Sequence, residues 1–227
     1  MKDHFHSPEK TAYRQDCNAF LRKHAGHILL DEAGALRGRW CELAGASGYV
    51  TLGALAQDGL LSDAQFIGVD NDPGNISTNR VQRPNATWVC NDLFQALKNF
   101  DDVSVLNLDG YRGADSGPGT HEIRYLLPTI RSSVSRFGAF VLFYNTDLDS
   151  ARYRKRQASE TLLAHTHAVC GQLSNWFPGR CWVTDVILTG SLVRKVDAAE
   201  YVGSLGEHYF IYRGNQHRMA NLKLVFR

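Results

Sequence analysis

A turn of small residues near position 45 has a carboxylate at its start and could bind a ligand. An apolar run ends in Glu42, Leu43 and Ala44, and the small residues continue through Gly45, Ala46, Ser47 and Gly48. Small side chains let the backbone approach a ligand closely, and the first N–H groups of the next helix are free to donate hydrogen bonds. The Glu42 carboxylate could bind a cationic amino group. The same small residues would also allow a strand and a helix to pack closely, so the turn needs further support.

Three later apolar runs also end in acid or amide side chains. Asp70 and Asn71 follow the second run, Asn91 and Asp92 follow the third, and Asp109 ends the fourth. In open α/β folds, ligands bind at the carboxyl edge of the parallel strands. At that edge Asp70 could accept hydrogen bonds from both hydroxyls of a ribose, and Asn91 or Asp92 could contact an adenine edge. The alternative is that these residues only cap the helices that follow them.

The apolar runs themselves predict the elements that position these side chains. They are rich in Val, Ile, Leu and Phe, they do not alternate with polar residues, and each precedes a segment long enough for a helix. The five runs are Arg39–Ala44, Gln65–Asp70, Ala86–Cys90, Val103–Asp109 and Gly138–Tyr144. This pattern is typical of strands buried on both faces of a parallel sheet. It predicts a doubly wound α/β fold with about seven strands and helices on both faces.

The remaining segments predict a helix at each end of this series and a hairpin that closes the sheet. A helix is expected at Pro8–Lys23, with Ser7 as its N-cap, and a long polar helix from about Ala151 to Asn175. A further strand is expected at Trp182–Leu188. The last two runs predict an antiparallel hairpin around a loop at Arg213–Ala220; they are Glu207–Tyr212 and Asn221–Phe226. We divide the chain into an N-terminal helical extension, residues 1–38, and a Rossmann-like domain, residues 39–227.

Composition limits the classes of protein that the chain can belong to. Its 227 residues, 44% of them apolar and 21% charged, suit one large globular domain. A formal net charge of +2 does not by itself indicate a nucleic-acid binder. The five cysteines are far apart, and no cysteine or histidine spacing predicts a metal site. Because no long apolar run or leader-like segment occurs, we expect a soluble protein in the reducing cytoplasm.

The ordered strand-end residues resemble the motif series of class I S-adenosylmethionine-dependent methyltransferases over roughly residues 39–145. The turn that begins at Glu42 is similar to the Asp-Leu-Gly-Ala-Ala-Pro-Gly-Gly pattern of ribosomal-RNA 2′-O-methyltransferases, with several departures. The resemblance implies that Glu42 and the backbone of residues 44–48 flank the methionine portion of S-adenosylmethionine. It also implies that Asp70 holds the ribose and that Asn91 or Asp92 lies near the adenine.

The resemblance does not extend to the methyl acceptor. The chain lacks the lysines of the 2′-O-methylating tetrad, the (Asp/Asn)-Pro-Pro-(Tyr/Phe) motif of amino-group methyltransferases and the Pro-Cys of cytosine C5-methylation. Asp109 and Tyr111 are the first catalytic candidates, because methyl transfer needs positioning and, for some acceptors, a base. Asp109 could hydrogen-bond a substrate hydroxyl or amine, and Tyr111 could stack on the substrate. A turn at Asp109-Gly110 and simple packing of Tyr111 are the alternatives.

Three residues are candidates for substrate binding. Asn145 ends the fifth run, where it could join the substrate pocket or cap a helix. Arg152 and Arg154 belong to a basic cluster, residues 152–156, which includes Tyr153 and could bind phosphates and stack a base. A solvated helix face is the alternative for this cluster. The basic cluster slightly favours nucleic acid over a small molecule as the methyl acceptor.

Three hypotheses of function follow. The first is an S-adenosylmethionine-dependent methyltransferase whose acceptor is unknown. The second is a non-catalytic, methyltransferase-like binding or regulatory protein, which the missing substrate motifs suggest. The third is a nicotinamide-dependent enzyme. Two features argue against it: the sequence has no G-x-G-x-x-G spacing, and it predicts a C-terminal hairpin.

Overall fold

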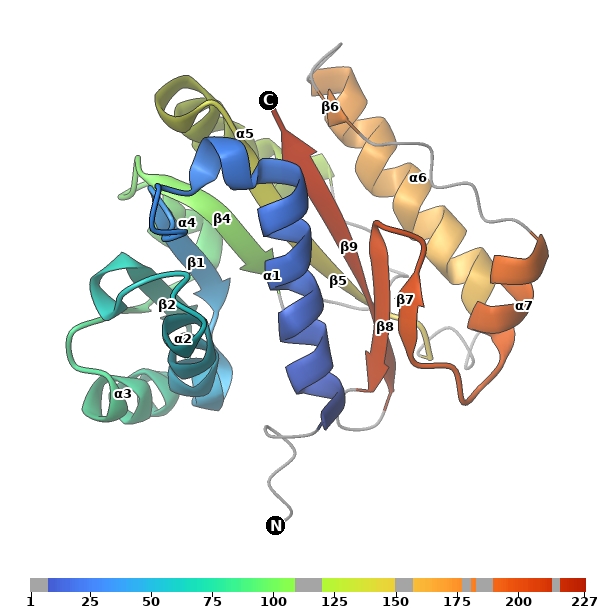
Figure 1. The fold of residues 1–227 in the computed structure, drawn as a ribbon, viewed down its shortest axis with the longest axis horizontal. Helices are drawn as coiled ribbons and strands as arrows, with labels where there is room; N and C mark the ends of the chain where they lie inside the picture. Colours follow the sequence, from blue (N-terminus) through green and yellow to red (C-terminus); the bar gives the residue numbers. More distant parts are fainter. Residues whose placement is uncertain (1–7, 109–119, 150–156, 177–180, 183–189, 214–216) are drawn as a thin grey trace.

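The apolar runs of the sequence form the parallel strands of one sheet in the computed structural model, which describes residues 8–108, 120–149, 157–176, 181–182, 190–213 and 217–227 (Figure 1). The helices of the described residues are α1 (Pro8–Leu29), α2 (Gly48–Gln57), α3 (Pro73–Gln82), α4 (Leu93–Leu97), α5 (Thr120–Phe137), α6 (Ala158–Trp176) and α7 (Gly190–Asp197). The strands are β1 (Arg39–Leu43), β2 (Phe66–Asp70), β3 (Thr87–Cys90), β4 (Val103–Leu108), β5 (Phe140–Asp147), β6 (Cys181–Trp182), β7 (Gly203–Leu205), β8 (Tyr209–Arg213) and β9 (Arg218–Phe226).

The order of the strands confirms the predicted fold class. Along the sheet the order is β3-β2-β1-β4-β5-β9-β8-β7, and β6 pairs with β9. Strands β1 to β5 pair in parallel, whereas β9 is antiparallel to both β5 and β8. The short strand β7 is antiparallel to β8, so the C-terminal end of the sheet is antiparallel throughout. A mostly parallel α/β sheet closed by an antiparallel hairpin is the architecture that the sequence predicted.

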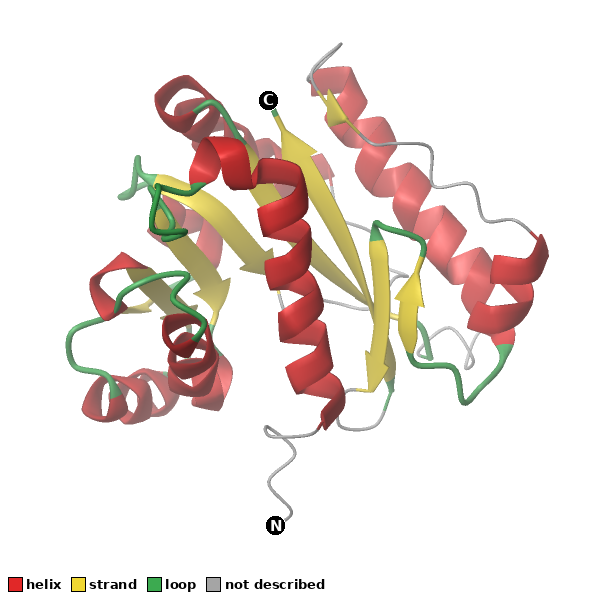
Figure 2. Ribbon diagram, in the orientation of Figure 1, coloured by secondary structure: helices red, strands yellow, loops and turns green. Residues whose placement is uncertain are grey.

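Helices cover both faces of the sheet (Figure 2). Buried residues of α1, α2 and α3 share one apolar cluster with one face, and those of α4, α5, α6 and α7 share a second cluster with the other. Burying a side chain such as Leu or Phe contributes roughly 1.5–3 kcal/mol, so these two layers supply most of the driving force for folding. They also leave the carboxyl ends of β1, β2 and β3 at one open edge.

Helix α1 packs on the sheet beside the C-terminal hairpin. Its buried side chains include Tyr13, Phe20 and Leu21, and they join the cluster that contains Trp40 and Phe143. The Tyr13 ring stacks on Tyr212 of β8 with 4.5 Å between the centroids. Residues from both ends of the chain thus share one core. The division of the chain after residue 38 stays a prediction.

Several boundaries and counts differ from the sequence prediction. The described sheet has nine strands rather than about seven, because β6 and β7 are two and three residues long and are too short to form apolar runs. Helix α1 continues to Leu29, six residues beyond the predicted end at Lys23. The expected strand at 182–188 lies mainly outside the described residues, as do residues 151–156 of the expected long helix. The hairpin strands extend further into the predicted loop, to Arg213 and back to Arg218.

The described cysteines lie in different environments. Cys41 is buried in β1, and its burial raises the pKa of the thiol, which keeps the thiol protonated and inert. Cys90 is exposed, because β3 is the edge strand of the sheet. No three His, Cys, Asp or Glu side chains lie close enough to hold a metal ion in the part of the chain that is described. No described helix has the length and apolar character needed to cross a membrane.

Candidate functional site

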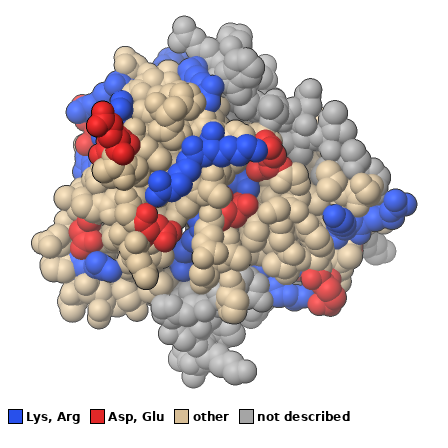
Figure 3. Space-filling view, in the orientation of Figure 1, with Lys and Arg blue, Asp and Glu red and all other residues tan. Residues whose placement is uncertain are grey.

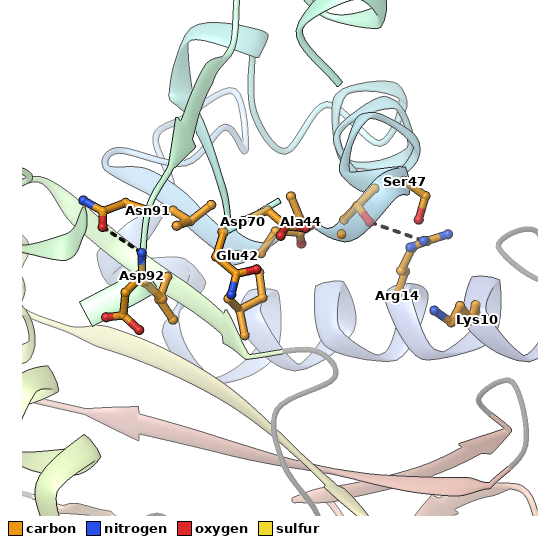
Figure 4. Close-up of a pocket in the computed structure, with 14 residues that line it drawn as sticks. Lys10, Arg14, Glu42, Ala44, Ser47, Asp70, Asn91 and Asp92 are labelled. Atoms are coloured by element: carbon orange, nitrogen blue, oxygen red, sulfur yellow. Dashed lines mark hydrogen bonds between the residues drawn. The ribbon is translucent and has the colours of Figure 1, made fainter. Parts of the chain in front are cut away.

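A pocket of about 370 Å³ opens at the carboxyl ends of β1, β2 and β3, beside α1 (Figure 4). Fourteen residues line it, and eight of them are sequence candidates for cofactor binding: Glu42, Ala44, Gly45, Ser47, Asp70, Asn71, Asn91 and Asp92. The volume lies within the usual range for small-molecule sites. The structure therefore brings residues from three strand ends to one pocket. Of the ten candidates, Ala46 and Gly48 do not line it.

Gly48 and Gly68 serve packing between the strands and α2 rather than contact with the pocket. A Cβ on Gly48 would lie 2.6 Å from the Ala44 Cβ and 3.0 Å from Trp88 Cζ3. A Cβ on Gly68 would lie only 2.2 Å from Trp88 Cζ3. The Trp88 ring occupies the space that the two glycines leave, and its Nε1 donates to the carbonyl of Arg83 at 2.8 Å. The packing alternative considered for the turn is thus correct for Gly48.

Replacing Gly68 with alanine is expected to lower the free energy of unfolding by roughly 1–3 kcal/mol, because the new Cβ would force Trp88 from its place. Urea denaturation measures the change. Gly26→Ala is the matched control, since a Cβ at Gly26 would meet its nearest atom at an ordinary 3.5 Å inside a helix. A Gly68→Ala protein as stable as the control would contradict the packing role.

Asn79 of α3 fixes the turn after β1 and was not a sequence candidate. It is fully buried; its Nδ2 donates to the Gly45 carbonyl at 2.8 Å, and its Oδ1 accepts from the Tyr49 N–H at 2.9 Å. Gly45 adopts a φ of +54°, which glycine tolerates best. One asparagine therefore holds both ends of the turn. A single polar residue in a helix gave no sequence signal for this role.

Two donors among the described residues hold the Glu42 carboxylate at the pocket wall. Glu42 is 3% exposed, and its Oε2 accepts hydrogen bonds from Trp40 Nε1 at 3.2 Å and from Asn107 Nδ2 at 3.3 Å. Asn107 in turn accepts a hydrogen bond from the Tyr13 hydroxyl at 2.9 Å. Buried charges need such partners, because burial without them is costly. The strand-end acid is thus fixed by side chains of β1, β4 and α1.

The acids at the ends of β2 and β3 accept hydrogen bonds from residues that follow them closely in the chain. The Asp70 Oδ1 accepts from the Asp72 N–H at 2.8 Å, and its Oδ2 accepts from Asn75 Nδ2 at 3.0 Å. Asp92 caps α4, accepting from the N–H groups of Phe94 and Gln95 at 3.0 and 3.1 Å. The capping alternative therefore holds for Asp92, although Asp92 also lines the pocket.

Two cations from α1 complete the pocket and were missed in the sequence. Lys10 and Arg14 are one helical turn apart, both line the pocket, and Arg14 Nη2 donates to Thr51 Oγ1 at 3.3 Å. Figure 4 shows Lys10 and Arg14 at one end of the pocket with Ser47, and Asn91 and Asp92 at the other. Nothing in the sequence indicates that α1 reaches this edge.

The catalytic and substrate-binding candidates lie elsewhere or outside the described residues. Asn145 is fully buried in β5, where its Oδ1 accepts from Asn221 Nδ2 of β9 at 2.6 Å, and it does not line the pocket. Its side chain therefore joins β5 to β9. Asp109, Tyr111, Arg152 and Arg154 belong to segments that the structure does not describe, so their roles stay predictions.

Several solved structures that are similar to this chain are methyltransferases. The plantazolicin methyltransferase BpumL, in complex with a triazolic desmethylPZN analogue and SAH, has a TM-score of 0.53 at 10% identity, covering 99% of this chain and 88% of that one. Its complex with a pentazolic analogue gives a TM-score of 0.50 at 11% identity, with the same coverage of both chains.

TrmN from Thermus thermophilus has a TM-score of 0.46 at 11% identity, over 93% of this chain and 48% of TrmN. This chain thus spans about half the length of TrmN. No family model and no curated protein matches the sequence. The likeness to BpumL establishes that the chain has the class I methyltransferase fold.

Proposed function

We propose that this chain binds S-adenosylmethionine in the pocket beside α1 and transfers its methyl group to an acceptor. The observation that carries the proposal is the arrangement of charged and polar groups in the pocket: Lys10 and Arg14 lie at one end, Asn91 lies at the other, and Glu42 and Asp70 lie between them. A ligand with a carboxylate, an ammonium group, a ribose and a base offers the complementary series of groups. S-adenosylmethionine has these groups in that order.

Each group of the cofactor has a candidate partner. Arg14 and Lys10 would bind the methionine carboxylate, since guanidinium and ammonium groups pair with carboxylates. Glu42 would receive the ammonium group, and Asp70 would accept hydrogen bonds from the ribose hydroxyls. Asn91 and Asp92 lie where the adenine edge would be read. The bound cofactor would supply a sulfonium-activated methyl group.

The class I methyltransferase fold and the binding of SAH by BpumL in crystals support this cofactor. A nicotinamide cofactor is less well matched, because it has no amino-acid portion. The two cations, Lys10 and Arg14, and the Glu42 carboxylate would then have no carboxylate and ammonium group to pair with. The non-catalytic alternative stays open until turnover is measured. Methyl transfer to any acceptor by the purified protein would exclude it.

The acceptor and the catalytic roles of Asp109 and Tyr111 stay predictions. Nucleic acid was favoured by residues 152–156, which lie outside the described residues. On the face drawn in Figure 3, basic and acidic side chains are interspersed. Two exposed cations of α1 already have acceptors, because Arg22 donates to the Asp58 carbonyl and Lys23 pairs with Glu207. That face therefore adds no support for nucleic acid.

Calorimetric titration with S-adenosylhomocysteine, S-adenosylmethionine and NAD tests the cofactor. Replacing Asp70 with alanine is expected to weaken S-adenosylhomocysteine binding by about 10–100-fold, because charge-assisted hydrogen bonds to the ribose are lost. Asp72→Ala is the matched control: Asp72 is exposed, caps α3 and does not line the pocket. It should lower stability and leave the affinity within about twofold.

Two results would reject the proposal. One is no binding of either adenosyl compound at millimolar concentration. The other is an equal loss of affinity in the Asp70 and Asp72 variants, which would show that Asp70 does not contact the ligand.

A further inference from the structure

Tyr13 of α1 is connected to the pocket acid through one buried side chain. Its hydroxyl donates to Asn107 Oδ1 at 2.9 Å, and Asn107 Nδ2 donates to Glu42 Oε2 at 3.3 Å. Tyr13 and Asn107 are only 2% and 4% exposed. Tyr13 does not line the pocket, whereas Glu42 does. These two hydrogen bonds give Tyr13 a route to the pocket acid that needs no contact with a ligand.

The chemistry of the three groups fixes the direction of this chain of hydrogen bonds. A carboxylate only accepts, so Asn107 must turn its NH₂ group toward Glu42 and its carbonyl oxygen toward Tyr13. The tyrosine hydroxyl must then donate. Removing that hydroxyl takes away the donor that keeps the Asn107 amide in this orientation. Trp40 Nε1 remains as a second donor to the same Glu42 oxygen, so the carboxylate would keep its place with less constraint on its orientation.

We infer that Tyr13 is a positioning residue for the amino-acid portion of the ligand, because through Asn107 it orients the Glu42 carboxylate that receives the ammonium group. This inference rests on the proposed function. Helix α1 then contributes in two ways to the part of the pocket that would hold the amino-acid portion. Lys10 and Arg14 reach the ligand directly, and Tyr13 acts from the face of the helix that packs on the sheet.

The experiment compares two ligands in the full chain and in its Tyr13→Phe variant. S-adenosylhomocysteine carries the amino-acid portion, whereas 5′-methylthioadenosine lacks it. We expect Tyr13→Phe to weaken binding of S-adenosylhomocysteine by about threefold to tenfold, the effect of one buried hydrogen bond, and to leave that of 5′-methylthioadenosine within about twofold. A general loss of structure would weaken both ligands equally, so the difference between them reports positioning.

Two controls separate positioning from stability. Phe20→Leu alters another buried aromatic residue of α1, which packs against Phe143 and away from the pocket lining. It should lower Tm and leave both affinities within about twofold. In a Glu42→Gln background, adding Tyr13→Phe should cause no further loss for S-adenosylhomocysteine, because the carboxylate on which Tyr13 acts is already absent.

Equal losses for the two ligands, or no loss for S-adenosylhomocysteine, would overturn the role of Tyr13 and leave the proposed function standing. A wild-type protein that binds neither S-adenosylhomocysteine nor 5′-methylthioadenosine would overturn both.

Discussion

Replacing Asp149 with asparagine is expected to lower the free energy of unfolding by about 3–5 kcal/mol, because it leaves the buried Arg218 guanidinium without a counter-charge. Arg218 is 1% exposed. Its Nε and Nη2 donate to Asp149 Oδ1 at 3.2 and 3.0 Å, and its Nη1 donates to the carbonyls of Val196 and Ala198. The Arg218 N–H also donates to Asp149 Oδ2 at 2.8 Å. The pair thus joins the end of β5, the start of β9 and the end of α7, and urea denaturation measures its loss.

The matched control is an exposed ion pair on the same hairpin. Arg213 at the end of β8 pairs with Glu200 at 2.9 Å, and the Glu200 side chain is 91% exposed. Glu200→Gln should change stability little, since solvent screens exposed ion pairs. An Asp149→Asn protein that loses as little free energy of unfolding as Glu200→Gln would contradict this prediction. It would show that the Arg218 guanidinium does not need the Asp149 carboxylate as a counter-charge.

Lowering the pH from 6.5 to 4 is expected to remove roughly 3 kcal/mol of stability through His165 alone. His165 is 3% exposed and packs against the tilted ring of Tyr144, with 5.0 Å between the ring centroids. Neither ring nitrogen has a hydrogen-bond partner in the described structure. Burial lowers the pKa of His165 from 6.5 to about 4. Below pH 6.5 the unfolded chain therefore takes up a proton that the folded protein does not, and stability falls until the folded pKa is reached.

Urea denaturation across this pH range measures the effect in wild type and in His165→Gln. The difference in slope between the two proteins isolates His165, because other groups contribute equally to both. His167→Gln is the control, since His167 lies two residues further along α6 and is exposed. Parallel stability curves for wild type and His165→Gln would show that His165 is not buried in the neutral form.

Much of the fold could be predicted because five strands of the sheet are rich in apolar residues that do not alternate with polar ones. Burial on both faces demands this composition, so the runs that begin at Arg39, Gln65 and Val103 gave strand positions to within about two residues at most boundaries. Parallel strands place their carboxyl ends together. The positions of Glu42, Asp70 and Asn91 at those ends therefore implied that they meet, and the pocket brings them together.

The tertiary structure decided what covers that edge. Lys10, Tyr13 and Asn79 are polar residues on helices, and local sequence does not indicate which neighbour a helix residue faces. Only the packing of α1 across the sheet places Lys10 in the pocket and Tyr13 against Asn107. The short strands β6 and β7 are likewise set by pairing with longer neighbours, because two or three residues carry no period of their own.

The sequence by itself determined the α/β class, the parallel strands and the line of acids and amides at their ends, since these depend on composition and on residue order along single strands. The tertiary structure alone decided that Gly48 accommodates Trp88, that Asn145 pairs with Asn221 and that α1 supplies the cations of the pocket. Each of these depends on contacts between residues far apart in the chain. Local sequence patterns do not indicate such contacts, because they form only when the chain folds.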